Sequence, residues 1–439
     1  MKNLMNFQTS AKLVKEPGEE KLYSSYAPQL KKGRVENVIV GVDSGSTQVR
    51  STVCRLSDEV EAFDHVYVIP STFTDYKDTK VLVPEGPELF YNMDSHIMSS
   101  ILPPHNKFDK VRVLRGNKCI NANGALSRIN SSIQKVNTEA FYINIIDAIA
   151  YSLIMDATER NMGLSETFNV YLACSLPPDD VTSTKNKSTF INSIKGTFTW
   201  VSKDLGVSIT INVADVLVTT EPEAAIKCHY MLQGEEIPET VMGIDAGGRS
   251  IGSEILLGGT SFMPARKTFR YGGNQLIDSI ADAYVNMHGG SRPKDDAIKR
   301  ALANGVYTRA KNSTDITDLI KQKKYEFGLN LHSDVIKNIF DTQRTVFAED
   351  IEAIVLSGRC FGRGDYDCSI ADVLIEEFRK ISPECEIVQI DQYLIPVGNA
   401  IMGMLEFGSV LDENDVEQVK RLPSAEDEIE EVAVTSEVE

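Results

Sequence analysis

The sequence lacks an uninterrupted apolar run as long as a membrane-spanning helix needs, about 20 residues. Its longest apolar stretch, from Phe141 to Met155, is interrupted by Asn144 and Asp147. The N-terminal segment carries charges such as Lys15, whereas a signal peptide would be apolar there. We therefore expect a cytoplasmic protein that makes no contact with a membrane.

Paired cysteines and clustered histidines are absent too. The seven cysteines are an odd number without a C-x-x-C pair, and the six histidines do not have metal-ligand spacing. Scattered cysteines are typical of proteins in a reducing compartment. Neither a disulfide framework nor a zinc site is expected, and His229, next to Cys228 in a predicted helix, is interpreted as structural.

Positive charge is scarce relative to negative charge. The 63 acidic residues outnumber the 45 basic residues, which gives a formal net charge of −18 and argues against direct binding to nucleic acid. A chain of 439 residues with 42% hydrophobic content can bury more than one core, so full disorder is excluded. We expect two domains or one large bilobed unit.

The chain divides into a polar start, a folded middle and an acidic end. Residues 1–34 are expected to form an N-terminal extension, and residues 411–439 an acidic C-terminal tail in which residues 416–422 are compatible with a short helix. Between them strand-like and helix-like runs alternate, which is typical of an α/β protein. Residues 139–158 and 369–381 are predicted to be helices with one apolar face toward a core.

One strand–turn–strand pattern occurs twice. Residues 40–45 read VGVDSG and residues 242–247 read MGIDAG, each at the end of an apolar run and before a second predicted strand. The duplication predicts two similar halves, each presenting a hairpin tip with one carboxylate, Asp43 or Asp245. Because a charge beside a core is costly unless it is paired, hydrated or bound to a metal, both carboxylates need a partner.

Turns made of small residues leave backbone N–H groups uncovered, and such turns bind anions, above all phosphates. Two facing turns would hold a polyphosphate. Asp43 and Asp245 would then repel each other and the phosphates unless a cation lay between them. Hydrated Mg²⁺ fits this position because it keeps several waters and takes few carboxylates. Either hairpin alone also fits an ordinary β-turn, in which Asp and Gly are common.

A glycine-rich loop follows a third predicted strand. The segment 351–364, IEAIVLSGRCFGRG, runs from apolar residues into Gly358, Gly362 and Gly364. These glycines would allow the backbone to approach a planar ligand or a ribose closely. The segment also fits a plain connection from a strand to a helix.

Two predicted helix starts carry residues suited to chemistry. Glu221 precedes Pro222 directly after an apolar run, and its carboxylate would orient a water molecule or simply interact with the helix dipole. Gly272 and Gly273 precede another predicted helix, where they would pass near a phosphate or ribose or form a turn.

In chain order, these elements resemble the actin-like ATPase superfamily: a phosphate hairpin, a Glu-Pro connection, a second hairpin, a Gly-Gly helix start and an adenosine loop. The first hairpin, DSGSTQVR at residues 43–50, is most similar to that of the ParM group of bacterial plasmid-segregation actins, whose pattern is Asp-x-Gly-Ser-Thr-x-x-basic. The Pro-Ser pair at 70–71 and the Leu-Pro pair at 176–177 stand where that group has a turn and a strand end.

The resemblance covers roughly residues 35–410 and implies a duplicated, ribonuclease H-like actin fold of the α/β class, with a nucleotide cleft between two lobes. Residues 35–220 would form lobe I, to which 391–410 would return, and residues 221–390 would form lobe II. The implied cofactors are ATP or GTP together with Mg²⁺.

The resemblance also implies roles for single residues. Asp43 and Asp245 would hold the hydrated Mg²⁺, Glu221 would position the attacking water, and these three residues form the expected catalytic set. The expected phosphate contacts are Gly45, Ser46, Thr47, Arg50, Gly247 and Gly248, and the expected nucleoside contacts are Gly272, Gly273, Ser357 and Gly358.

Two positions depart from the family pattern. The second hairpin has Arg249 where glycine is usual, and this side chain would reach the phosphates or turn outward. The adenosine loop reads Ser-Gly-Arg where Gly-Gly is common, so Arg359 would stack on the base or alter nucleotide preference. The choice between ATP and GTP is therefore open.

The function that the resemblance implies is a filament-forming ATPase that segregates plasmid or other DNA, with copies of itself and a DNA-binding adaptor as partners. A non-polymerising small-molecule kinase of the same fold is the alternative, although no carboxylate for an acceptor hydroxyl can be identified. A serine hydrolase would fit the G-x-S-x-G match at 248–252, but that motif requires a helix after the serine, and a strand is predicted there.

Overall fold

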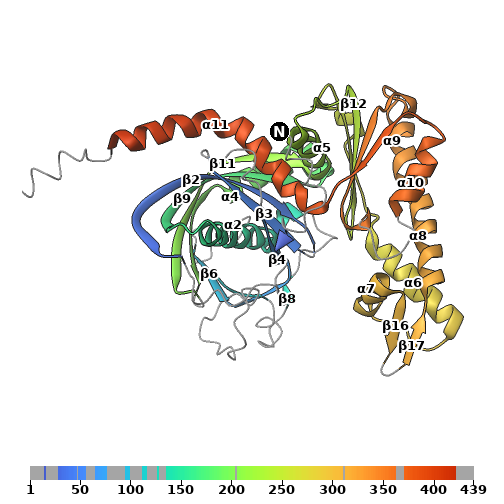
Figure 1. Cartoon of the computed structure of the whole chain (residues 1–439). Helices are drawn as coiled ribbons and strands as arrows, with labels where there is room; N and C mark the ends of the chain where they lie inside the picture. Colours follow the sequence, from blue (N-terminus) through green and yellow to red (C-terminus); the bar gives the residue numbers. More distant parts are fainter. Residues whose placement is uncertain are drawn as a thin grey trace, which may run out of the picture.

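The computed structural model describes residues 14–15, 28–46, 48–55, 65–76, 94–98, 111–115, 126–127, 135–202, 205–309, 312–361 and 370–421. These residues form two large β-sheets with helices packed on them (Figure 1). The larger sheet and its helices are called the first lobe here, and the smaller sheet and its helices the second lobe. The α/β class expected from the sequence is confirmed.

The sheet of the first lobe has the strand order β1-β4-β3-β2-β9-β11-β10-β6-β7-β5-β8. Its strands are β1 (Val14–Lys15), β2 (Leu30–Ser44), β3 (Gln48–Cys54), β4 (Val66–Pro70), β5 (Phe73–Tyr76), β6 (Asp94–Met98), β7 (Val111–Leu114), β8 (Leu126–Ser127), β9 (Leu164–Leu176), β10 (Gly196–Ser202) and β11 (Val207–Thr220). The sheet of the second lobe has the order β14-β13-β12-β18-β19, and β15 also pairs with β13. Its strands are β12 (Thr240–Ala246), β13 (Ile251–Leu257), β14 (Thr260–Ser261), β15 (Lys267–Phe269), β18 (Ala353–Ser357) and β19 (Glu386–Gln389). Strands β16 (Val306–Arg309) and β17 (Asn312–Asp315) form a separate hairpin.

The helices connect and cover these sheets. They are α2 (Glu139–Glu159), α3 (Pro178–Thr182), α4 (Thr184–Ile194), α5 (Glu221–Gln233), α6 (Gly273–His288), α7 (Asp295–Asn304), α8 (Thr317–Leu331), α9 (Lys337–Thr342), α10 (Ile370–Arg379) and α11 (Ile395–Arg421). Short 3-10 turns at Lys135–Asn137, Arg359–Phe361 and Gln392–Leu394 lie before α2, after β18 and before α11.

The two sheets share one central pattern. In the first lobe, β2 pairs antiparallel with β3 and parallel with β9, which pairs parallel with β11. In the second lobe, β12 pairs antiparallel with β13 and parallel with β18, which pairs parallel with β19. Asp43 lies beside Ser175 of β9, and Asp245 lies beside Ser357 of β18. The predicted duplication is confirmed, and it extends to the neighbouring strands.

Helix α2 is buried on all sides in the first lobe. Every residue from Phe141 to Ala157 is buried, because the larger sheet curls around the helix (Figure 1). The expectation of a single apolar face was therefore wrong for this helix. Within the part of the chain that the structure describes, α2 is also the one helix long and apolar enough to cross a membrane, and all of its apolar window is buried in the protein.

The polar residues of α2 are paired inside this core. Asp147 accepts hydrogen bonds from Arg115 at 2.7 Å and from the Trp200 indole at 2.8 Å. Ser95 donates to the same carboxylate at 3.0 Å, and Arg115 also donates to Asn144 at 2.7 Å. The two polar residues that interrupt the longest apolar stretch thus belong to one buried hydrogen-bonded network.

Some element boundaries differ from the expected ones. Strand β2 begins at Leu30 and pairs there with the start of β9, inside the segment expected to be an extension. Helix α11 continues without a break to Arg421, so the helical residues at the start of the expected acidic tail belong to α11 and not to a separate short helix. Helix α10 buries Val373, Leu374 and Phe378 along one side, in agreement with the predicted apolar face.

Helix α11 packs on β2 of the first lobe and on α5 (Figure 1). Two glycines allow backbones to pass closely here. A Cβ atom on Gly41 of β2 would collide with the carbonyl oxygen of Pro396, and one on Gly398 would collide with that of Ala224 in α5. The three elements are therefore in direct backbone contact.

We expect Gly398→Ala to destabilise the protein by about 1–3 kcal/mol, the usual cost of forcing extra atoms into a packed interior. The matched control is Gly408→Ala in the same helix. A Cβ atom there meets no described atom within 4 Å, and alanine in place of a helical glycine stabilises by about 1 kcal/mol. Urea unfolding measures both changes, and equal stability of the two variants would contradict the close packing of α11 on α5.

Candidate functional site

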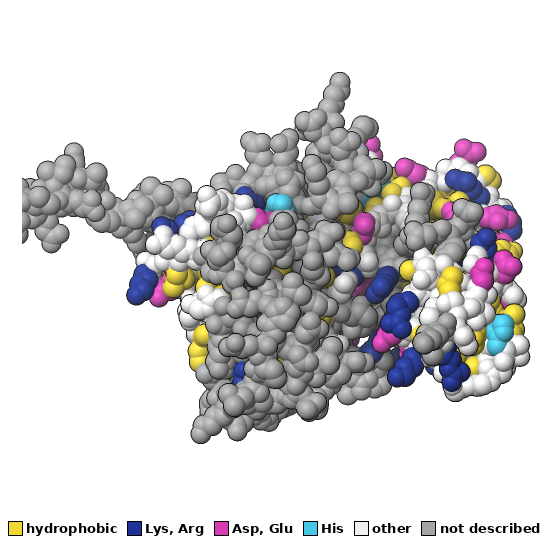
Figure 2. Space-filling model, turned by 60° about the horizontal axis from the view of Figure 1, so that its bottom comes forward, with side chains coloured by type: hydrophobic (Ala, Val, Ile, Leu, Met, Phe, Trp, Pro, Cys, Tyr) yellow, Lys and Arg dark blue, Asp and Glu magenta, His cyan; other side chains and the backbone are white. Residues whose placement is uncertain are grey.

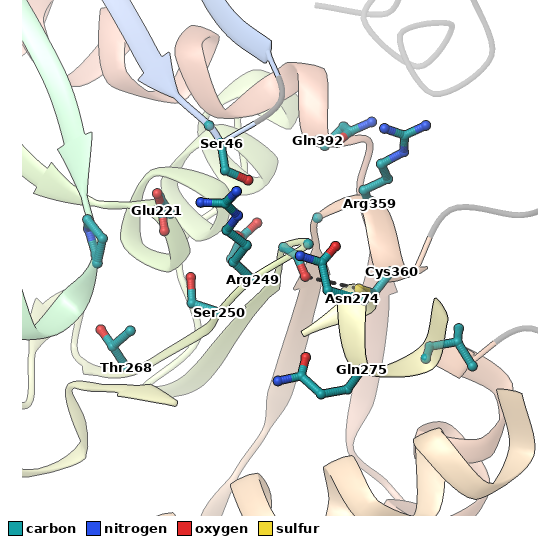
Figure 3. Close-up of a pocket in the computed structure, with 18 of the residues that line it drawn as sticks. Ser46, Glu221, Arg249, Ser250, Thr268, Asn274, Gln275, Arg359, Cys360 and Gln392 are labelled. Carbon is teal, nitrogen blue, oxygen red and sulfur yellow. Dashed lines mark hydrogen bonds between the residues drawn. The ribbon is translucent and has the colours of Figure 1, made fainter. Parts of the chain in front are cut away.

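A cleft of about 850 Å³ lies where the tips of the two hairpins meet. The starts of α5 and α6 and the turn after β18 also line it (Figure 3). The predicted residues that line the cleft are Asp43, Gly45, Ser46, Arg50, Glu221, Asp245, Gly247, Gly248, Gly273 and Gly358. The structure therefore brings residues from distant parts of the sequence to one site.

Two predicted site residues lie behind the cleft instead of lining it. Ser357 is fully buried, and its hydroxyl donates a hydrogen bond to Asp245 at 2.8 Å, so it supports the hairpin carboxylate. Gly272 packs against the backbone of the second hairpin, where a Cβ atom would not fit. Three further residues named from the sequence, Thr47, Gly362 and Gly364, lie outside the described residues.

Asp43, near the end of β2, forms an ion pair within its own hairpin. Its side chain is 3% exposed, and its Oδ2 lies 2.6 Å from Nη1 of Arg50 in β3. Arg50 also donates from Nη2 to Gln392 at 2.7 Å, and its guanidinium lies 5.2 Å from the centre of the Tyr393 ring. The same arginine therefore balances Asp43 and joins the first hairpin to the segment before α11.

Asp245 occupies the corresponding place in β12, and its environment differs. Burial raises the pKa of Asp245 to about 7, and the nearby carboxylates of Glu221 and Asp43 add to this effect. The hydrogen bond from Ser357 acts in the opposite direction. The three carboxylates are thus close enough to affect one another, and a cation between them would relieve the repulsion.

Glu221 is the first residue of α5 and lines the cleft (Figure 3). The local sequence fixes the helix start at this point. The Thr220 hydroxyl accepts a hydrogen bond from the Glu223 N–H at 3.1 Å, and Pro222 stands in the first turn, where its missing N–H costs nothing. The Glu221 carboxylate is therefore held at the end of β11, next to both hairpins.

Lys135, in the turn before α2, was missed by the sequence analysis. Its Nζ donates to Oε1 of Glu221 and to the carbonyl oxygen of Ser44, both at 3.0 Å. Burial by itself lowers the pKa of Lys135, but the charges of Glu221 and Asp43 outweigh burial and raise it overall. The sequence around Lys135 contains no recognisable motif, so only the fold could reveal it.

The two arginines that depart from the family pattern both line the cleft. Arg249 extends from the second hairpin toward Ser46 and Glu221, so it does not turn outward, and Arg359 lies beside Gln392 (Figure 3). Other basic residues of the second lobe that line the cleft are Arg270, Lys299 and Lys324. Figure 2 shows Lys and Arg side chains on the side of that lobe that faces the first. These positive charges suit a polyanionic ligand.

A serine nucleophile of the hydrolase type does not fit this geometry. Ser250 is followed directly by strand β13, whereas the nucleophile elbow places a helix after the serine. Ser250 instead closes the hairpin turn, because its carbonyl oxygen accepts a hydrogen bond from the Gly247 N–H at 3.0 Å.

The acidic residues of the cleft suit a hydrated cation. The described part of the chain contains no group of three or more His, Cys, Asp or Glu side chains that could enclose a metal ion. Asp43 and Asp245 nevertheless face one cleft and interact electrostatically. This arrangement fits Mg²⁺, which takes few carboxylates and keeps most of its water ligands.

Comparison with known proteins gives a clear answer for the fold. No family model and no curated protein sequence matches the chain. The apo ParM protein of pSK41 matches with a TM-score of 0.57 and 16% identity, over 85% of this chain and 99% of its own. An archaeal actin homologue matches with a TM-score of 0.60 and 14% identity, over 84% and 99%. The chain has the actin-like fold.

A third actin-like structure, Bacillus thuringiensis ParM with ATP, matches with a TM-score of 0.55 and 12% identity, over 84% of this chain and 99% of its own. The resemblance to the actin-like superfamily, and to ParM within it, is therefore confirmed at the level of the fold. The expected bilobed, duplicated architecture is confirmed with it. Identities this low carry no information about activity.

Without nucleotide or metal, the contribution of Asp245 to the stability of the protein should fall as the pH rises from about 4 to about 7. Folded Asp245 has a pKa of about 7, whereas an unfolded aspartate has a pKa of about 3.9. At Asp245 the folded state therefore binds more protons than the unfolded state in this interval, and the contribution of this residue to stability falls as pH increases.

Asp245→Asn cannot ionise and should remove this contribution, so the variant should gain stability relative to the native protein between pH 4.5 and pH 8. Urea unfolding at both pH values measures the difference. Asp278→Asn, at an exposed carboxylate of α6, is the control. An Asp245→Asn variant whose stability relative to the native protein does not change with pH would contradict the raised pKa.

Proposed function

We propose that the protein is a cytoplasmic, filament-forming ATPase that segregates plasmid or other DNA. The observation that supports this best is the meeting of Asp43, Asp245 and Glu221 at one cleft beside two turns of small residues. Structural neighbours with the same fold include an archaeal actin homologue in complex with ADP and a ParM with ATP. We assign ATP, or GTP, with Mg²⁺ to this cleft.

The two lobes take complementary parts in this proposal. We assign residues 35–220 and 391–410 to lobe I and residues 221–390 to lobe II. Backbone N–H groups of both hairpin turns hold the phosphates, and Arg50 adds positive charge beside them. Mg²⁺ held by Asp43 and Asp245 would supply the charge that neutralises the phosphates.

The three carboxylates have separate tasks. Asp43 and Asp245 would hold hydrated Mg²⁺, and its positive charge would lower the pKa of Asp245. Glu221 positions the water that attacks the terminal phosphate. Because no covalent intermediate forms, such preorganised groups carry most of the catalysis.

The proposed partners are other copies of the chain and a DNA-binding adaptor. A filament requires each subunit to present two different, complementary surfaces, because only a head-to-tail contact propagates. The net charge of −18 opposes direct contact with DNA, so an adaptor connects the filament to it. Among the structural neighbours is a non-polymerisable quadruple mutant of pCBH ParM.

Sedimentation and electron microscopy of the purified protein test the filament directly. We expect filaments in the presence of ATP and Mg²⁺ and none without nucleotide. A protein that stays in the supernatant and phosphorylates an acceptor would instead be a small-molecule kinase of the same fold.

The proposal predicts that Glu221→Gln lowers phosphate release by about 10²-fold or more, because the water loses its positioning group. Filaments of this variant should disassemble more slowly, because hydrolysis of the bound nucleotide is what destabilises them. The control is Glu223→Gln, two residues along the same helix and paired with Lys227. Phosphate release by Glu221→Gln at the native rate would remove Glu221 from this role.

Arg249→Ala should weaken ATP binding by about tenfold or more, the usual effect of losing a hydrogen bond to a charged group. AMP binding should change little, because Arg249 reaches the hairpin end of the cleft. Calorimetric titration with both nucleotides separates the two effects, with Arg292→Ala, an exposed arginine outside the cleft, as control. Equal losses for AMP and ATP would show that Arg249 does not contact the phosphates.

A further inference from the structure

Lys135 is a largely buried cation at the cleft, with 16% of its side chain exposed. Its two hydrogen bonds, to Glu221 and to the Ser44 carbonyl, reach different elements. Lys135 itself lies just before α2, Ser44 ends the first strand of the first hairpin, and Glu221 begins α5. One ammonium group therefore joins three elements at the cleft.

The surroundings of this lysine keep it charged. Glu221, Asp43 and Asp180 all favour the ammonium form and together overcome the effect of burial. A buried lysine that remains charged is constrained in position, because moving it away from its carboxylate would leave both charges unpaired.

The Lys135 contact restrains the part of Glu221 that matters for positioning a water molecule. A glutamate at a helix start has several side-chain rotamers, and only some direct a carboxylate oxygen into the cleft. Lys135 binds Oε1, while Oε2 accepts no hydrogen bond from any described residue. One oxygen is thus fixed by the protein and the other is left for a water molecule, as orientation-dependent catalysis requires.

We propose that Lys135 is a positioning residue for nucleotide hydrolysis. It fixes Glu221 through one carboxylate oxygen and ties that orientation to the first phosphate hairpin through the Ser44 carbonyl. The inference rests on the proposed ATPase function. Through this contact, a movement of the first hairpin at Ser44 would change the position of the Glu221 carboxylate.

The test compares hydrolysis with binding. For Lys135→Met we expect kcat for Mg·ATP to fall by about 10²-fold, while the Kd of a non-hydrolysable ATP analogue changes by less than about tenfold. Lys135→Arg keeps the charge and should recover part of kcat. The matched control is Lys227→Met, in the helix α5 that begins at Glu221. This change removes a lysine–glutamate ion pair of 2.9 Å, between Lys227 and Glu223, and Lys227 does not line the cleft. The control should keep the native kcat.

A double variant tests whether Lys135 acts through Glu221. Lys135→Met/Glu221→Gln removes both charges, so no unpaired carboxylate is left to disturb folding. If Lys135 acts only by holding Glu221, the double variant should hydrolyse ATP at the rate of Glu221→Gln alone.

Three results would overturn the inference. The first is a native kcat in Lys135→Met, and the second is a kcat in the double variant that is reduced by the product of the two single reductions. The third is loss of analogue binding in Lys135→Met, which would make Lys135 a ligand contact. A native protein that binds the analogue but hydrolyses no ATP, or that binds no nucleotide at all, would overturn the proposed ATPase function instead. The two failures are therefore distinguishable.

Discussion

The actin-like fold of this chain has to hold three acidic side chains beside one cleft. Asp43, Glu221 and Asp245 are each less than a tenth exposed, and each is balanced in a different way. Arg50 pairs with Asp43, Lys135 pairs with Glu221, and Asp245 has a raised pKa and a hydroxyl donor behind it. Because a buried charge without a partner is strongly destabilising, these contacts constrain where both hairpins and α5 can lie.

The parts of the site that the sequence predicted are those with a local signal. Each hairpin combines an apolar strand, an Asp-x-Gly turn and a returning strand within a few residues, so strand, turn and carboxylate could be read together. The start of α5 could be predicted in the same way, because Pro222 follows Glu221 directly after a predicted strand. The repeat of the hairpin was the decisive signal, since two copies predicted both the duplication and the facing carboxylates.

The parts that the sequence did not predict depend on contacts between distant segments. Lys135 is 86 residues from Glu221, and Arg50 is 342 residues from Gln392, so neither pair leaves a pattern in the chain. Ser357 was assigned to the nucleoside because its segment resembles the adenosine loop of the family, but it is the last residue of β18 and its hydroxyl donates to Asp245 in the neighbouring strand. The burial of α2 on every side was missed because it arises from the curl of the whole sheet.

The enclosed position of α2 also bears on how the protein is synthesised. This helix leaves the ribosome before β9, β10 and β11, and the Trp200 that donates to Asp147 belongs to β10. During that interval the nascent chain carries a helix as apolar as a membrane segment, with a carboxylate whose partners are incomplete. Such a chain is prone to aggregation, so we expect molecular chaperones to shield it until the remaining strands have been translated.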